Sequence, residues 1–163
     1  MDCGPDNGTK PFVLGPDESR GAAGGPWRTR VRGVDTGGLL VIGEAEMPPM
    51  SSGPSLHVHT REDEASFVIE GVLTVVLGTE QFDVPAGGVA WLPRGVPHTF
   101  ANLTREPVRV LGMIVPGDLE AMFVEQSAYF RSLQGPPDPG VVDEIGQRYG
   151  VTVVGPPVAI PTG

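Results

Sequence analysis

Cysteine, lysine and histidine are all scarce in this chain of 163 residues. The only cysteine, Cys3, cannot form a disulfide within the chain, which fits a reducing compartment. The only lysine is Lys10, and 20 acidic residues outnumber 11 basic ones to give a net charge of −9. A surface of that charge repels nucleic acid and anionic membranes, so we expect neither as a partner.

Long apolar runs are also missing. No stretch approaches the ~20 apolar residues that span a bilayer, and the first residues lack the charged-then-apolar pattern of a signal peptide. Together with the single cysteine, these absences predict a cytoplasmic protein.

Glycine and proline, in contrast, are abundant at 24 and 18 residues, so turns are frequent and long helices few. Between residues 25 and 115 they separate short apolar runs. From Leu39 to Met47, apolar or small residues alternate with Glu44 and Glu46, as in a half-buried strand. Glu70-Gly71 marks a tight hairpin between two further strands. Short strands at this spacing predict an all-β sandwich or barrel.

Beyond Pro116 the pattern becomes helical. One helix is predicted with Asp118 as its N-cap and Gly135 as its stop, and a second from Asp138-Pro139 to Gly150. One apolar stripe of the first helix holds Leu119, Met122, Phe123, Gln126, Phe130 and Leu133. We therefore expect a flexible or edge N-terminal segment at 1–24, a barrel at 25–116, and a helical appendage and tail at 117–163, its helices packed outside the barrel.

Two of the three histidines lie in "HVHTREDEASFVIEG". His57 and His59 are two residues apart, which on a strand places both side chains on one face. Glu64 follows five residues after His59. By itself this stretch fits either half of a metal site or a polar strand followed by a solvated turn. We assign Glu62 and Asp63 to that turn.

The third histidine, His98, lies in "GGVAWLPRGVPHTFAN" and brings a second fixed spacing. That spacing is G-x5-P-x-G-x2-H-x3-N, carried by Gly87, Pro93, Gly95, His98 and Asn102. The earlier stretch reads H-x-H-x4-E-x6-G, carried by His57, His59, Glu64 and Gly71. At these positions the chain resembles the cupin superfamily, although it has Ser51 where that family has the opening glycine of its first motif.

The resemblance implies a cupin jelly-roll barrel that binds one metal ion through His57, His59, Glu64 and His98. Three imidazoles and a carboxylate suit divalent Fe, Mn, Ni, Co, Cu or Zn. Glu64 is either a permanent ligand or a general base that acts on substrate. Phe100 shares a face with His98 on a regular strand, so it lines the substrate pocket or packs in the core. Asn102 is expected to stabilise a turn.

Four stretches extend the resemblance to small bacterial quercetin 2,3-dioxygenase-like cupins: "PFVLGPDESR", "LHVHTREDEASFVIEG", "PGDLEAMF" and "RYGVTVVGPP". That resemblance implies an oxidoreductase in which the metal binds a flavonol or related enol, Glu64 accepts its proton, and O2 cleaves the ring with release of carbon monoxide. Two alternatives stay open. One is a polyketide cyclase or isomerase that uses the metal as a Lewis acid without O2, and the other is a non-catalytic metal- or ligand-binding cupin.

The expected partners are a small-molecule substrate, O2 and a second copy of the chain. Small cupins commonly form homodimers, and the stretch "GPWRTRVRGV" offers a strand with Arg28, Arg30 and Arg32 on one face. The same pattern also fits an edge strand protected by charge.

Overall fold

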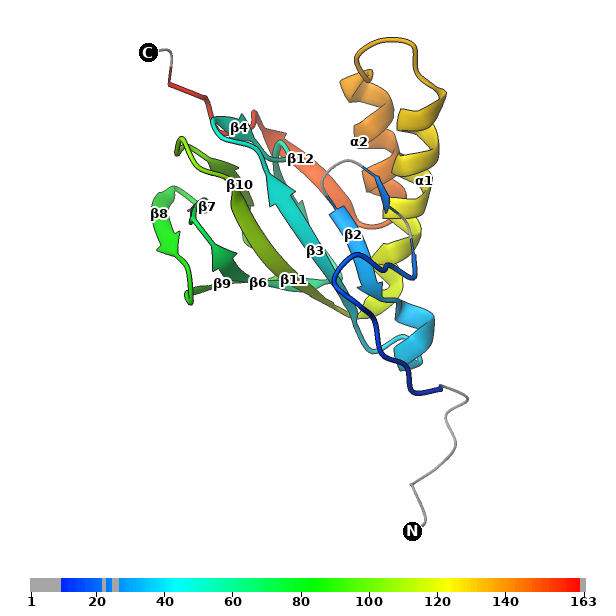
Figure 1. The fold of residues 1–163 in the computed structure, drawn as a ribbon. Coiled ribbons are helices and arrows are strands. Elements are labelled where there is room, and N and C mark those ends of the chain that lie inside the picture. Colours follow the sequence, from blue (N-terminus) through cyan, green and yellow to red (C-terminus); the bar gives the residue numbers. More distant parts are fainter. Residues whose placement is uncertain (1–9, 22, 25–26, 162–163) are drawn as a thin grey trace.

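The structure, a computed structural model, describes residues 10–21, 23–24 and 27–161. Two β-sheets face each other and two helices lie outside them (Figure 1). The strands are β1 (Ala23–Gly24), β2 (Trp27–Val31), β3 (Val41–Met47), β4 (Ser51–Ser52), β5 (Leu56–His59), β6 (Asp63–Glu70), β7 (Val72–Leu77), β8 (Glu80–Pro85), β9 (Val89–Leu92), β10 (His98–Asn102), β11 (Val108–Val115) and β12 (Val151–Gly155). The helices are the 3-10 turns η1 (Gly33–Thr36) and η2 (Gly117–Leu119) and the α-helices α1 (Glu120–Ser132) and α2 (Pro139–Arg148).

Both sheets are antiparallel. One has the order β1-β2-β3-β11-β6-β9, and the other β12-β5-β10-β7-β8, with β4 paired to β10. Neighbours such as β5 and β10 are distant in sequence, as in a jelly roll. The prediction of an all-β jelly-roll barrel with helices outside it is confirmed. No helix of the described part is both long and apolar enough to cross a membrane.

The core lies between the sheets and follows the two-residue period of the strands. In β11, Val108, Val110 and Ile114 are buried, while Val115 is exposed. The main cluster consists of Ala45, Met47, Val68, Leu73, Val75, Ala90, Leu92, Val108 and Val110. Leu39 was expected on the buried face of this strand, but it lies outside the core. The strand β3 begins only at Val41, and the Leu39 side chain is 69% exposed.

The helices lie outside the sheets, against β1 and β12, and pack through a second cluster. This cluster contains Ile114, Leu119, Met122, Ile145 and Val151. The predicted cap of the first helix is wrong, because Asp118 lies within η2, and Leu119 precedes α1 without any side-chain cap. The predicted start of the second helix at Asp138-Pro139 is confirmed. The Asp138 side chain accepts a hydrogen bond from the Gly140 N–H at the start of α2.

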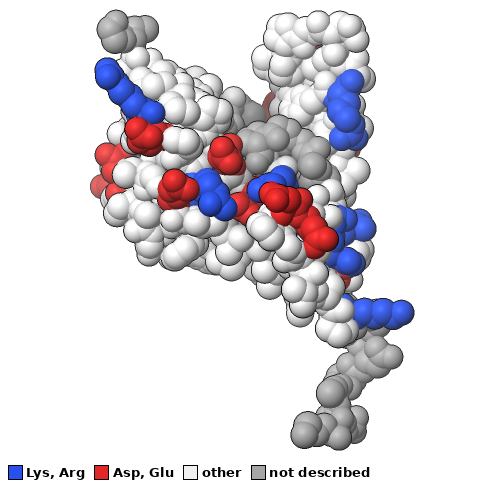
Figure 2. All heavy atoms as spheres, in the orientation of Figure 1, with Lys and Arg blue, Asp and Glu red and all other residues white. Residues whose placement is uncertain are grey.

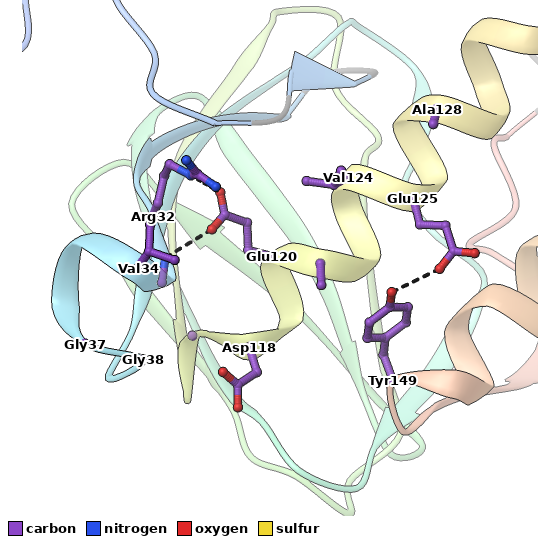
Figure 3. A pocket seen from close by; sticks show the side chains of 13 residues that line it. Arg32, Val34, Gly37, Gly38, Asp118, Glu120, Val124, Glu125, Ala128 and Tyr149 are labelled. Atoms are coloured by element: carbon purple, nitrogen blue, oxygen red, sulfur yellow. Dashed lines mark hydrogen bonds and ion pairs between the residues drawn. The ribbon is translucent and has the colours of Figure 1, made fainter.

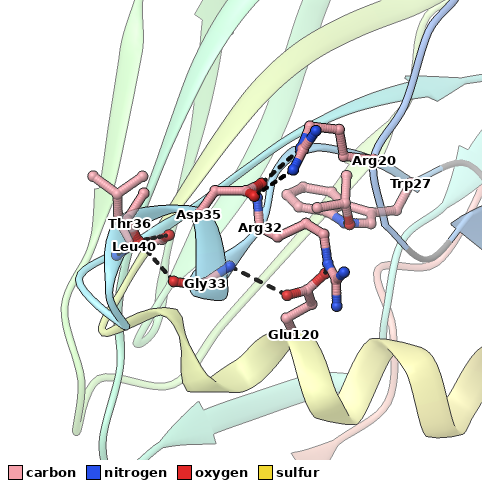
Figure 4. Close-up of polar contacts among 9 residues, drawn as sticks. Arg20, Trp27, Arg32, Gly33, Asp35, Thr36, Leu40 and Glu120 are labelled. Carbon is pink, nitrogen blue, oxygen red and sulfur yellow. Dashed lines mark hydrogen bonds and ion pairs between the residues drawn. The ribbon is translucent and has the colours of Figure 1, made fainter. Parts of the chain in front are cut away.

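A polar network ties the N-terminal segment to α1 (Figure 4). Arg20 donates two hydrogen bonds to Asp35, at 2.9 and 2.6 Å. Arg32 donates to Glu120 Oε1 at 2.9 Å, and the Gly33 N–H donates to Glu120 Oε2 at 3.2 Å. Of the segment expected to be flexible or at an edge, residues 1–9 and 22 lie outside the described residues, and residues 23–24 form the edge strand β1.

The expected tail contains an additional strand of the barrel. Residues Val151–Gly155 form β12, which pairs with β5 so that Val151 lies opposite His59 and Val153 opposite His57. Gly150, at φ +82°, turns the chain from α2 into this strand, a conformation that favours glycine. The C-terminal segment is therefore more than an appendage, because it flanks the strand that carries two histidines.

Candidate metal centre

Three strands bring the predicted ligands together inside the barrel. β5 carries His57 and His59, and β10 carries His98 directly opposite His57 in the pairing register. Glu64 comes from β6 in the facing sheet. The histidines are 8%, 1% and 0% exposed, because the alternation of each strand directs them inward. The two sheets thus contribute to one buried polar cluster.

The three imidazoles are close enough to share an ion. One ring nitrogen from each lies within 4.8 Å of the other two. The His57 and His98 rings are 4.6 Å apart between centroids, and the His59 and His98 rings are stacked at 5.3 Å. Four-coordinate zinc and similar ions bind imidazole nitrogens at about 2.0–2.1 Å, so small ring movements suffice to reach a common ion.

The hydrogen bonds of the histidines fix which nitrogen faces the centre. His57 Nδ1 donates to the Ser55 carbonyl at 2.8 Å, and His98 Nδ1 to the Val96 carbonyl at 3.0 Å. His59 Nδ1 lies 3.3 Å from Glu62 Oε2. Since carbonyl and carboxylate oxygens accept, each Nδ1 carries the proton and each Nε2 keeps a free lone pair. Among the described residues, Nε2 of His59 and of His98 is buried without a hydrogen bond.

The carboxylate of Glu64 faces these free nitrogens from the opposite sheet. Its Oε1 is 3.4 Å from His59 Nε2, and its Oε2 is 3.7 Å from His98 Nε2. Burial raises the pKa of Glu64, but the three nearby imidazoles outweigh burial and hold that pKa below its usual value. Glu64 is therefore an anionic oxygen donor beside three nitrogen donors.

His57 and His59 are neutral at physiological pH. Burial, together with the neighbouring His98, lowers the pKa of His57 to about 4. Burial also lowers the pKa of His59. A metal ion therefore displaces no proton from either ring. The buried unpaired nitrogens and the donor chemistry both fit a divalent transition metal as cofactor.

The interpretation of Glu62 and Asp63 as solvated turn residues is wrong. Glu62 is 2% exposed and contacts His59, and burial raises its pKa. Asp63 is the first residue of β6 and forms an ion pair with Arg94 at 2.6 Å, which lowers the pKa of Asp63 to about 2. A run of four polar residues gives no sign that one of them folds inward. The signal available was the spacing of Glu62, three residues after His59.

Phe100 and Asn102 follow His98 on the same face of β10. Phe100 is partly buried and packs against the core cluster, and its lining of a substrate pocket stays a prediction. Asn102 stabilises a turn, as expected. Its amide donates to the carbonyls of Pro48 and Glu106, and its Oδ1 accepts from the Thr104 N–H.

A hollow of about 940 Å³ lies outside the barrel between η1, η2 and α1 (Figure 3). None of the three histidines lines it. Three of its charged side chains are already paired: Arg32 with Glu120, and Glu125 with the Tyr149 hydroxyl at 3.0 Å. The histidine cluster, with its unpaired nitrogens, is therefore the better candidate for chemistry.

Comparisons with known proteins agree with this geometry. Residues 43–114, which include all four candidate ligands, match the family model for the cupin domain. An uncharacterized protein of Methanocaldococcus jannaschii is 30% identical over 63 residues, which are 39% of this chain and 50% of that protein. An uncharacterized protein of Streptomyces coelicolor is 36% identical over 55 residues, 34% of this chain and 51% of that protein. The chain thus spans about half the length of these curated relatives.

Solved structures show the same fold. An uncharacterized conserved protein from Klebsiella pneumoniae, described as having a double-stranded β-helix domain, superposes with a TM-score of 0.54 at 21% identity, covering 67% of this chain and 93% of that one. KdgF from Halomonas gives a TM-score of 0.55 at 16% identity, covering 66% and 94%. The match places a cupin domain at residues 43–114, and these solved structures share the fold of this chain.

Proposed function

We propose that this cupin barrel is a metal-dependent enzyme that acts on an enol-bearing small molecule, as a dioxygenase of flavonols or related aromatic compounds. The observation that carries the proposal is the position of Glu64, an ionised carboxylate within 3.4 and 3.7 Å of two free histidine nitrogens. The choice of oxygenation over other cupin chemistry is supported by the sequence resemblance to quercetin 2,3-dioxygenase-like proteins.

The cofactor would be one divalent transition metal, of the set Fe, Mn, Ni, Co, Cu and Zn. The Nε2 atoms of His57, His59 and His98 would hold it together with Glu64. When bound, such an ion acts as a Lewis acid that lowers the pKa of an enol hydroxyl. The carboxylate of Glu64 would offset part of the ion's charge.

The protein's own contribution is to position the substrate and move one proton. Glu64 is the described carboxylate nearest the free nitrogens, so it would accept the enol proton on one oxygen. The imidazoles would not compete for that proton, because each Nε2 would be bound to the metal and each Nδ1 already carries a proton. Phe100 would give the substrate ring an apolar surface beside His98.

The test is reconstitution of the metal-free protein under anaerobic conditions with each of the six metals, followed by addition of quercetin and then O2. We expect a shift of the quercetin absorption on binding, then oxygen uptake with release of carbon monoxide. Glu64→Gln should retain the fold and lose turnover. Glu70→Gln is the matched control, because Glu70 lies on the same strand and its side chain is 63% exposed.

The outcomes separate the alternatives. Turnover of a polyketide-type enol without oxygen uptake would replace the dioxygenase by a cyclase or isomerase. Tight metal binding without turnover of any enol would indicate a binding protein. A wild-type chain that binds none of the six metals would overturn the proposal altogether.

A further inference from the structure

We infer that Glu62 is a positioning residue that holds His59 in the orientation and tautomer needed for metal binding. The inference deepens the proposed function, since it concerns the same metal centre. It starts from an unexpected contact: Glu62 lies in the short connection between β5 and β6, yet its side chain folds inward, and its Oε2 lies 3.3 Å from His59 Nδ1.

His59 differs from the other two histidines in the partner of its Nδ1. His57 and His98 donate to backbone carbonyls two residues before them, which the strand geometry holds in place. His59 has a side-chain carboxylate instead. A carboxylate partner makes an imidazole a stronger donor than a carbonyl does, because its negative charge stabilises positive charge on the ring. The geometry therefore makes the centre asymmetric, with His59 as its strongest nitrogen donor.

The surroundings of Glu62 support this role over a simple ion pair. Arg61 and Arg94 are the guanidinium groups whose charges act on Glu62, but the Arg94 side chain donates its hydrogen bonds to both oxygens of Asp63, at 3.0 and 2.6 Å. Glu62 is left facing the imidazole at 2% exposure. Burying a carboxylate is costly unless hydrogen bonds or a charge compensate it. A protonated Nδ1 next to a metal ion at Nε2 supplies both.

The first experiment measures cobalt(II) affinity by competition with a chelator. We expect Glu62→Leu to weaken binding by about 10- to 100-fold, the usual effect of removing an outer partner of a metal-bound histidine. Glu62→Gln should lose less, since its amide oxygen still accepts from Nδ1 but carries no charge. Asp63→Asn is the matched control, because the neighbouring carboxylate contacts Arg94 and no histidine. Its affinity should equal that of the wild type.

The second experiment needs no metal. Long-range ¹⁵N–¹H spectra of the metal-free protein report which nitrogen of each histidine carries the proton. We expect His59 to be protonated on Nδ1 in the wild type and in Glu62→Gln, and to lose that preference in Glu62→Leu, while His57 and His98 stay unchanged. Should Glu62→Leu fail to fold, Glu62→Gln provides the test. A cobalt affinity below that of the wild type supports the role of Glu62, and an unchanged affinity contradicts it.

The inference is overturned if folded Glu62→Leu binds cobalt as tightly as the wild type and keeps His59 protonated on Nδ1. A wild-type protein that binds no metal would instead refute the proposed function, and the spectra would still show whether Glu62 selects the tautomer of His59. The two failures are thus distinguishable.

Discussion

The polar groups inside the barrel and those on its outer surface differ in how they are satisfied. Outside, arginines and carboxylates pair with each other, as Arg109 does with Glu44 at 2.7 Å and Arg94 with Asp63 at 2.6 Å. Figure 2 shows acidic and basic side chains next to one another across one face. Inside, the free nitrogens of His59 and His98 have no hydrogen-bond partner among the described residues.

This difference separates groups that serve stability, the outer ion pairs, from groups suited to a function, the buried histidines. An exposed ion pair typically contributes about 0–1 kcal/mol, and it is complete without any ligand. A buried polar atom without a partner costs about 1–3 kcal/mol, so a fold retains it only where something else compensates. The interior cluster is therefore the part of this molecule that an added ion would complete.

The largest effect is expected from removing one interior donor. His98→Ala should weaken cobalt affinity by more than the ~100-fold upper effect of an outer partner, because a direct nitrogen ligand is lost. Chelator competition measures it. Arg109→Ala, which removes an outer ion pair, should leave the cobalt affinity unchanged. A loss equal to that of His98→Ala would contradict the difference between interior and outer polar groups.

The second prediction uses pH to sharpen the comparison. His57 has a pKa of about 4 when folded and about 6.5 when unfolded, so the unfolded chain binds more protons between these values. The free energy of unfolding of the metal-free protein should therefore fall by about 3 kcal/mol as the pH drops from 7 to 4, on account of His57. Above pH 6.5 this contribution is constant.

Urea denaturation of the wild type and of His57→Asn at several pH values measures that contribution. The variant should lose much of the slope between pH 6.5 and 4. If the free energy of unfolding changed equally with pH in both proteins, burial would not lower the pKa of His57. Outer pairs behave differently: the lowered pKa of Asp63 gives stability that is lost only below pH 4.

The smallest effect is expected outside the barrel. Arg109→Ala should lower the free energy of unfolding by about 1 kcal/mol, because Glu44 is only 7% exposed but Arg28 and Arg30 remain near it at 3.6 and 3.8 Å. Urea titration with the metal affinity measured in parallel tests it. A loss of several kcal/mol would show that this outer network is as critical as the core.

The sequence predicted the barrel, and three of its four candidate ligands, His57, His59 and His98, lie together in the structure. That these residues and Glu64 bind a metal stays a prediction. His57 and His59 share a strand face, and His98 stands in its own spaced motif. Glu62 was misjudged because its burial depends on how the β5–β6 connection folds inward, which a charged run does not reveal. The strand at Val151–Gly155 was missed because its partner is distant in the chain.

That last strand has a consequence for the order of folding. Thr60, just after β5, donates a hydrogen bond to the Gly150 carbonyl, 90 residues away, and both helices lie in the connection between the two strands. Closing so long a loop is slow compared with forming neighbouring hairpins. We therefore expect the strand that carries His57 and His59 to gain its outer neighbour late. The histidine cluster would reach its final packing only when residues 151–155 pair with residues 56–59.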